Sequence, residues 1–173
     1  VGVPADAAAR LEALGHESFR EIEAYPALVG FWWPRFKRIA HWLAETEPSF
    51  RTGVAQVVAE TTGRLFFPIA GEEFLLACRA DRIDILAHGP GRIVDYKTGK
   101  PPTPKQVESG LSPQLTLQAA ILAGGGFAEA GPRPAEALAY IHISGGDPAG
   151  EVKLLDLGDV MQLAERHLAG LKR

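Results

Sequence analysis

Hydrophobic and polar residues follow two different periods along this chain, and the change comes at Gly53. Before it, apolar residues recur every three or four positions among alanine and glutamate, which predicts helices. We expect one helix over residues 4–25 and a second over 34–44, with Pro48 marking the end of the second. After Gly53, β-branched residues and glycine-bearing turns predict short strands.

The pattern beyond Gly53 predicts a strand meander followed by alternating helices and strands. Strands are expected over residues 54–60, 64–67, 74–86 and 92–97, with a turn at 61–63 and another at 89–91. A loop over 98–104 precedes a helix at 112–124, strands at 137–143 and 152–155, and an amphipathic helix at 159–171. This order predicts an α/β sandwich around a mixed sheet.

Composition narrows the class of protein. The chain has 173 residues, of which 46% are apolar and 23% charged, so we expect one domain over 1–173. Residues 1–50 would be its helical part and 53–173 its catalytic core. No apolar run approaches the roughly 18 residues of a membrane-spanning helix. The single cysteine, Cys78, excludes an internal disulfide or an iron–sulfur cluster, and a reducing cytoplasm is expected.

The net charge of −3 argues against a dedicated basic DNA-binding module. Contact with nucleic acid would need a local patch, a metal ion or a partner subunit. Phe31, Trp32 and Trp33 could stack on bases, although three neighbouring aromatic residues before a helix more often belong to a core or a subunit interface.

The candidate chemistry lies on two of the predicted strands. Residues two apart on a strand share a face, so Asp95 and Lys97 project together and Asp84 faces away from Asp81. Asp81, on the neighbouring strand, can reach the same place as Asp95. Two converging carboxylates favour a hard cation such as Mg²⁺ or Mn²⁺. Lys97 would then orient or deprotonate the attacking water, and Glu60 is a candidate third carboxylate.

Structural explanations compete with these functional ones. Asp81 and Asp84 could form ion pairs with Arg79 and Arg82, and for Asp84 we favour that interpretation. Glu60 is equally consistent with a metal ligand and with a surface residue.

An aspartate followed, on the next strand of a hairpin, by Asp-Xaa-Lys is the pattern of PD-(D/E)XK phosphodiesterases. The chain resembles the C-terminal nuclease domain of the AddB family, of the alphaproteobacterial type, within the RecB-like nucleases. The matching stretches are FWWPRFKRIAHWL (31–43), RADRIDIL (79–86), IVDYKTGKPPTPKQVESGLSPQL (93–115) and QAAILAGGGF (118–127).

This resemblance implies a restriction-endonuclease-like PD-(D/E)XK core and metal-dependent exonuclease activity on DNA in double-strand break repair by recombination. Asp81 and Asp95 would be metal ligands and Lys97 the catalytic lysine. Gln114 would match a glutamine near the active site, although it could instead cap a helix. Gln118 stands where the family has a tyrosine.

The resemblance also implies an AddA-like helicase–nuclease partner that delivers single-stranded DNA, with no role for a membrane. No iron–sulfur cluster is expected. The family's His-bearing motif helix is expected upstream of Val1, which would make the chain a fragment of a larger subunit; His16 is the weaker candidate for that ligand. Two alternatives stay open: a catalytically incomplete nuclease fold that binds DNA or acts as a scaffold, and another RecB-like or Cas4-like exonuclease.

Overall fold

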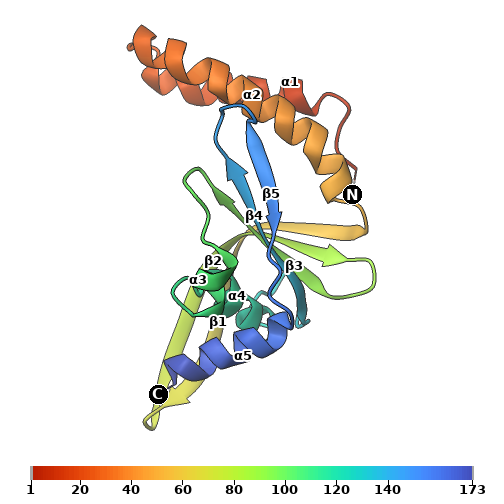
Figure 1. Cartoon of the computed structure of the whole chain (residues 1–173), viewed down its shortest axis with the longest axis vertical. Coiled ribbons are helices and arrows are strands. Elements are labelled where there is room, and N and C mark those ends of the chain that lie inside the picture. Colours follow the sequence, from red (N-terminus) through yellow and green to blue (C-terminus); the bar gives the residue numbers. More distant parts are fainter. Residues whose placement is uncertain (1, 173) are drawn as a thin grey trace. The chain divides into compact units, whose positions relative to one another are not determined.

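The computed structural model describes residues 2–172, and Figure 1 shows the elements in chain order. The chain forms two compact units. Unit 1 consists of Val1–Thr52 and His142–Glu151, and unit 2 consists of Gly53–Ile141 and Val152–Arg173. Each unit is therefore built from two separate stretches of the chain.

Unit 1 is built around two helices. Helix α1 (Ala7–Phe19) continues into a short 3-10 turn (Arg20–Ile22), and α2 spans Pro26–Phe50. The prediction that the second helix starts at 34 and ends at Pro48 is wrong. Pro26 occupies the first turn, where a missing N–H costs no helix hydrogen bond. Pro34 and Pro48 lie inside the helix, where each removes one backbone donor.

Aromatic side chains of α2 near Pro34 pack against α1. The Trp33 ring lies 3.9 Å from the ring of His16 and 5.4 Å from that of Phe19. Gly15 of α1 allows the Phe36 ring to approach closely, because a Cβ there would meet Phe36 Cε1 at 2.1 Å. The two helices of unit 1 are thus held together by an aromatic seam.

A hairpin tip completes unit 1. Strands β4 (Ala135–Ile143) and β5 (Gly150–Leu154) carry the tip, residues 142–151. Arg38 of α2 donates to the backbone oxygen of Gly145 through Nε at 2.9 Å and Nη2 at 2.6 Å. A Cβ at Gly150 would lie 2.6 Å from the Trp42 ring, so this glycine permits the close contact.

The five strands form one mixed sheet in the order β1-β2-β3-β4-β5, with β1 antiparallel to β2 and β2 antiparallel to β3. These three strands are β1 (Val54–Ile69), β2 (Glu72–Leu86) and β3 (Gly91–Lys97). The predicted turn at 61–63 is wrong, because β1 runs through it unbroken. The chain instead turns at Ala70 and Gly71, whose φ angles are +52° and +89°.

Gly63 was predicted to lie in a turn, but it is needed for close packing within the strand. A Cβ on Gly63 would meet Phe127 Cε1 at 2.4 Å and Ile121 Cγ2 at 2.8 Å. The glycine therefore lets the end of α4 and the following segment lie directly against the strand.

Three further helices complete unit 2: α3 (Pro104–Glu108), α4 (Gln114–Ala123) and α5 (Val160–Leu171). The nearly fully buried α4 contacts β1 and β3, and α5 packs on α4. The core between them includes Ile83, Ile93, Leu115, Ile121 and Leu138. The expected α/β class with a mixed sheet and helices is confirmed. The short α3 was not predicted, and the helix expected from residue 112 begins at Gln114, with Pro113 as its N-cap.

Candidate active site

Two neighbouring strands and one helix bring the predicted site residues together in unit 2. Strands β2 and β3 pair antiparallel, with Arg82 opposite Val94 and Asp84 opposite Arg92. Asp81 precedes this paired segment, and its Oδ2 accepts a hydrogen bond of 3.0 Å from the backbone nitrogen of Tyr96. The β2 aspartate is thereby fixed beside the Asp95-Tyr96-Lys97 segment of β3.

Asp95, Lys97 and Gln114 form a closed triangle of polar contacts. Gln114 Nε2, at the start of α4, donates to Asp95 Oδ1 at 2.6 Å. Lys97 Nζ lies 2.8 Å from Asp95 Oδ2 and donates to Gln114 Oε1 at 3.3 Å. The structure therefore brings Gln114, which the family resemblance added, against the Asp95–Lys97 pair that the strand pattern predicted.

The electrostatics of Asp95 follow from its position. The residue is only 3% exposed. Burial raises the pKa of Asp95 above its usual value, and the contact with Lys97 opposes this rise. The negative charge of Asp81 adds to the increase, and the hydrogen bond from Gln114 counteracts it. The net effect is a raised pKa, so Asp95 carries its negative charge at a cost that a cation would relieve.

The donor set fits a hard divalent cation. Asp95 Oδ2 is buried and makes no hydrogen bond within residues 2–172, and its contact with Lys97 Nζ is an ion pair without hydrogen-bond geometry. Asp81 is close enough for its charge to raise the pKa of Asp95. Mg²⁺ commonly binds through one or two carboxylates and keeps several waters. Asp81 and Asp95 match that requirement.

Glu60 does not join these two aspartates. Its Oε2 lies 2.7 Å from Arg79 Nη2, with both side chains largely exposed, and its backbone has a φ of +53°. Over residues 2–172, no group of three or more His, Cys, Asp or Glu side chains is arranged to hold a metal ion. Metal ligation by Glu60 stays a prediction without geometric support.

Asp84 has a structural role, as favoured from the sequence. Its fully buried carboxylate accepts hydrogen bonds from Arg82 Nε at 2.6 Å and from Arg92 Nη2 at 2.6 Å. Two guanidinium groups thus compensate one buried carboxylate, as buried charges require. Because both carboxylate oxygens of Asp84 accept hydrogen bonds from these arginines, Asp81 is the β2 aspartate that remains available to the site.

Two buried polar residues near the site were given no site role from the sequence. Tyr140 of β4 is 1% exposed and its hydroxyl has no hydrogen-bond partner within the described residues. Burial and the charge of Asp95 raise the pKa of Tyr140 to about 12. Gln118 of α4 donates to the backbone oxygen of Arg79 at 3.2 Å, while its own Oε1 is buried without a partner in the same range. For Tyr140, a hydroxyl inside the apolar run ALAYIHI was the available signal.

His16 and Cys78 lie apart from this group of residues. The His16 ring lies against Trp33 within the helix pair of unit 1, tilted by 39°. Cys78 is half-buried, and burial raises the pKa of its thiol. No helix among residues 2–172 is long and apolar enough to cross a membrane.

Comparisons with known proteins bear on the superfamily of the chain. The profile of the PD-(D/E)XK nuclease superfamily matches residues 3–170. An uncharacterized protein of Rickettsia felis is 42% identical over 77 residues, which cover 44% of this chain and 9% of that protein. One of Rickettsia bellii is 33% identical over 137 residues, which cover 71% of this chain and 16% of that protein.

The chain thus spans only a small part of the length of these relatives. The solved structure of SSO0001 aligns over 94% of this chain and 69% of its own, at 17% identity and a TM-score of 0.38. That likeness is too weak to support an argument.

Proposed function

Because the chain belongs to the PD-(D/E)XK nuclease superfamily, we propose that it is a metal-dependent deoxyribonuclease whose site is formed by Asp81, Asp95, Lys97 and Gln114. The observation that carries this proposal is the triangle of Asp95, Lys97 and Gln114 beside Asp81. Two carboxylates, an ammonium group and an amide lie close together there, a combination that supports metal-dependent phosphodiester hydrolysis.

Each residue has a defined task in this proposal. Asp81 and Asp95 would hold Mg²⁺ or Mn²⁺, which when bound acidifies a coordinated water and neutralises charge on the phosphate. Lys97 orients the attacking water and stabilises the negative charge that develops on the phosphoryl oxygens. Gln114 contacts both Asp95 and Lys97 and fixes their relative position. Tyr96 contributes its backbone N–H, which holds the Asp81 carboxylate.

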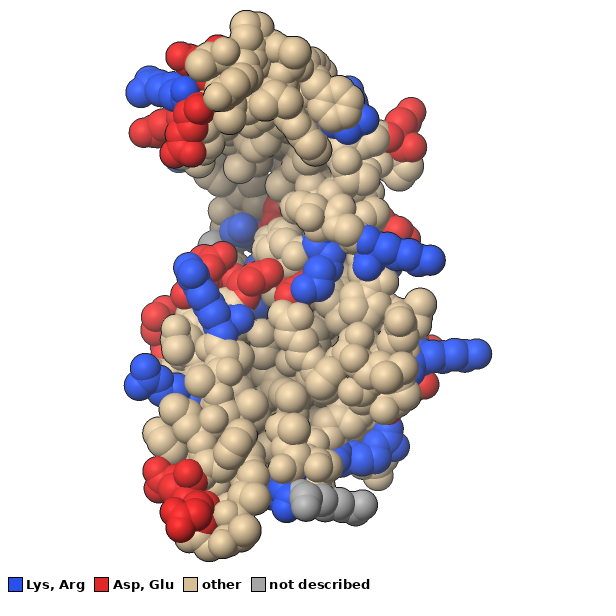
Figure 2. Space-filling view, turned by 90° about the vertical axis from the view of Figure 1, so that its left-hand side faces the viewer, with Lys and Arg blue, Asp and Glu red and all other residues tan. Residues whose placement is uncertain are grey.

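The finer assignment rests on the sequence resemblance. We propose that the whole protein is an AddB-type exonuclease subunit in the cytoplasm, which works with an AddA-like helicase in double-strand break repair. The helicase would deliver single-stranded DNA and supply much of the DNA affinity. The larger size of the relatives accords with a subunit that has further parts. The face drawn in Figure 2 has Lys and Arg side chains interspersed with Asp and Glu and shows no broad basic surface. This distribution is consistent with a partner that supplies much of the DNA affinity.

One observation favours the alternative of a catalytically incomplete domain. Within residues 2–172 the two aspartates gain no third His, Cys, Asp or Glu ligand. Calorimetric titration with Mn²⁺ separates the two proposals. A nuclease site should bind the cation in the parent chain, and the Asp95→Asn variant should not bind it. A scaffold domain shows no binding in either protein.

Cleavage of a labelled single-stranded oligonucleotide with Mn²⁺ tests the proposed function directly. Asp95→Asn and Lys97→Ala should each abolish cleavage while circular dichroism and the melting temperature show a folded chain. Asp6→Asn is the matched control, because Asp6 is an exposed carboxylate paired with Arg10 in unit 1. Cleavage at the parent rate by both site variants would contradict the assignment.

A further inference from the structure

One stretch of α2 is basic in an otherwise acidic chain. Residues 26–44 include Arg35, Lys37 and Arg38 and contain no aspartate or glutamate, whereas the whole chain has a net charge of −3. None of these three cations forms an ion pair within the part of the chain that the structure describes. Their charge is therefore available to an anionic partner.

The same helix exposes aromatic rings that its packing does not use. Trp33 lies in the seam with α1, but Phe31 and Trp32 are 53% and 49% exposed. The Arg35 guanidinium carbon lies 4.1 Å from the centre of the Phe31 ring and 5.7 Å from that of Trp32. Leu28 is exposed on the same side, since positions 28, 31, 32 and 35 share one helical face. The Phe31 and Trp32 rings meet edge to face, with centres 5.2 Å apart and an interplanar angle of 89°. With the arginine they form an exposed surface that unpaired bases can cover.

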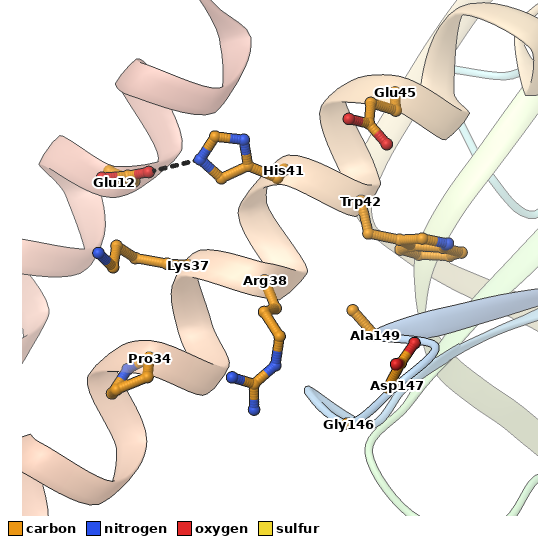
Figure 3. A pocket seen from close by; sticks show the side chains of 10 residues that line it. All are labelled: Glu12, Pro34, Lys37, Arg38, His41, Trp42, Glu45, Gly146, Asp147 and Ala149. Atoms are coloured by element: carbon orange, nitrogen blue, oxygen red, sulfur yellow. Dashed lines mark hydrogen bonds and ion pairs between the residues drawn. The ribbon is translucent and has the colours of Figure 1, made fainter.

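A hollow within unit 1 adjoins this face. It has a volume of about 410 Å³ and is lined by Lys37, Arg38 and Trp42 of α2, with Gly146 from the hairpin tip among its other walls. Figure 3 shows Lys37 reaching toward α1 and Arg38 toward the hairpin. Arg38 Nε and Nη2 are engaged by Gly145, while its Nη1 has no partner among residues 2–172.

Acidic residues also line the hollow. Three carboxylates, Glu12, Glu45 and Asp147, lie there with the two cations Lys37 and Arg38. Glu12 Oε1 lies 2.9 Å from His41 Nε2, and Figure 3 shows Glu45 and Asp147 on the side of Trp42. The hollow as a whole is therefore not cationic, and the exposed face of α2 is the better surface for an anion.

We propose that Phe31, Trp32, Arg35 and Arg38, here called the α2 platform, bind single-stranded DNA. Bases stack on Phe31 and Trp32, and the backbone phosphates contact Arg35 and Arg38, which lie on the same helical face as Phe31. Base–aromatic stacking with a cationic track is the usual mode of sequence-tolerant single-strand binding. Duplex DNA is disfavoured, because its bases are already stacked on one another. The proposal deepens the proposed nuclease function and rests on it for the choice of ligand.

Fluorescence anisotropy of a fluorescein-labelled oligothymidylate tests the platform, with EDTA present so that no cleavage occurs. Phe31→Leu and Trp32→Leu should each weaken binding about tenfold. Arg35→Gln should reduce the slope of log affinity against log salt by about 0.7. Phe66→Leu and Lys172→Gln are matched controls in unit 2, because Phe66 is 55% exposed and Lys172 lies beyond α5. Both controls should bind as the parent does.

Several results would overturn the platform. These are a parent chain that does not bind the oligomer, platform variants that bind like the parent, or equal losses in the controls. Tighter binding of a duplex of the same length would do so as well. A change in sedimentation of Phe31→Leu without a change in DNA affinity would instead assign the face to a protein partner.

The same experiment separates this proposal from the proposed function. A chain that binds through the platform but never cleaves with Mn²⁺ contradicts the nuclease assignment and leaves the platform standing. A chain that cleaves, with binding unchanged in Phe31→Leu and Arg35→Gln, overturns the platform alone.

Discussion

At the scale of single residues, the two buried aspartates of the sheet differ in how their charges are compensated. Asp84 accepts hydrogen bonds from two arginines and is complete within the fold. Asp95 has one ammonium partner and one amide donor, and one of its oxygens lacks a hydrogen bond within the described residues. The first arrangement stabilises the sheet, whereas the second keeps binding capacity for a cation.

Replacing Asp84 by alanine should destabilise the fold strongly. The change would leave the buried guanidinium groups of Arg82 and Arg92 without their carboxylate, which typically costs about 3–5 kcal/mol. Glu60→Gln, which breaks the exposed pair with Arg79, should cost less than about 1 kcal/mol. Urea denaturation followed by circular dichroism measures both free energies of unfolding. Equal losses would contradict the distinction between the two ion pairs.

Metal affinity should fall as the pH is lowered. Because the pKa of Asp95 is raised, this carboxylate keeps its proton to a higher pH than an ordinary aspartate does. The proton and the cation compete for the same oxygens, so protonation weakens binding. Calorimetric titration of Mn²⁺ should therefore give a lower affinity at about pH 5 than at about pH 7. An affinity independent of pH over this interval would exclude Asp95 as a ligand.

The sequence was most informative where neighbouring positions alone determine the geometry. Asp95 and Lys97 share a face because strand residues alternate, so their contact was predictable. Gln114 was added by resemblance to a family. The positive φ of Glu60 and its pairing with Arg79 depend on how β1 bends, which periodicity does not encode. Tyr140 lies near the charge of Asp95 because β4 is next to β3, a long-range pairing.

At the scale of elements, residues that usually interrupt structure lie inside it. Pro34 and Pro48 stand within α2, and Gly63 stands within β1. Local propensity placed boundaries at or near all three positions. Tertiary packing determined the outcome instead, through the Trp33 seam against α1 and the contact of Phe127 with Gly63.

Gly63→Ala should destabilise unit 2, because the added methyl group would overlap Phe127 and Ile121. Overpacking of this kind costs about 1–3 kcal/mol. Gly170→Ala is the matched control, since Gly170 lies in α5 with open space around it. It should stabilise the protein by about 0.5–1 kcal/mol through helix propensity. Thermal melting compares the two, and a neutral Gly63→Ala would show that the strand is not tightly packed there.

At the scale of the whole molecule, two strands connect the units. Strands β4 and β5 both begin in one unit and end in the other, because residues 142–151 belong with α2. A substitution that destabilises the sheet is therefore expected to destabilise unit 1 as well, through this hairpin. The expectation of a single domain over 1–173 stays a prediction, now with a specific test.

Tryptophan fluorescence provides that test, because Trp32, Trp33 and Trp42 all lie in unit 1. The Gly63→Ala change is in unit 2. If the strands couple the units, this change should lower the urea midpoint seen by fluorescence together with the midpoint seen by circular dichroism. A fluorescence midpoint that stays at the parent value while the other falls would mean that the units unfold independently.

The inserted hairpin also sets an order of events on the ribosome. Helices α1 and α2 emerge first, but residues 142–151, which complete their unit, are translated about ninety residues later. At a translation rate of roughly 5–20 residues per second, the hairpin is synthesised on the order of 5–20 seconds after the helix pair. During that interval the Trp42 ring and the Arg38 guanidinium lack their partners Gly150 and Gly145. The nascent helical pair is therefore the stage at which this chain would most need a chaperone.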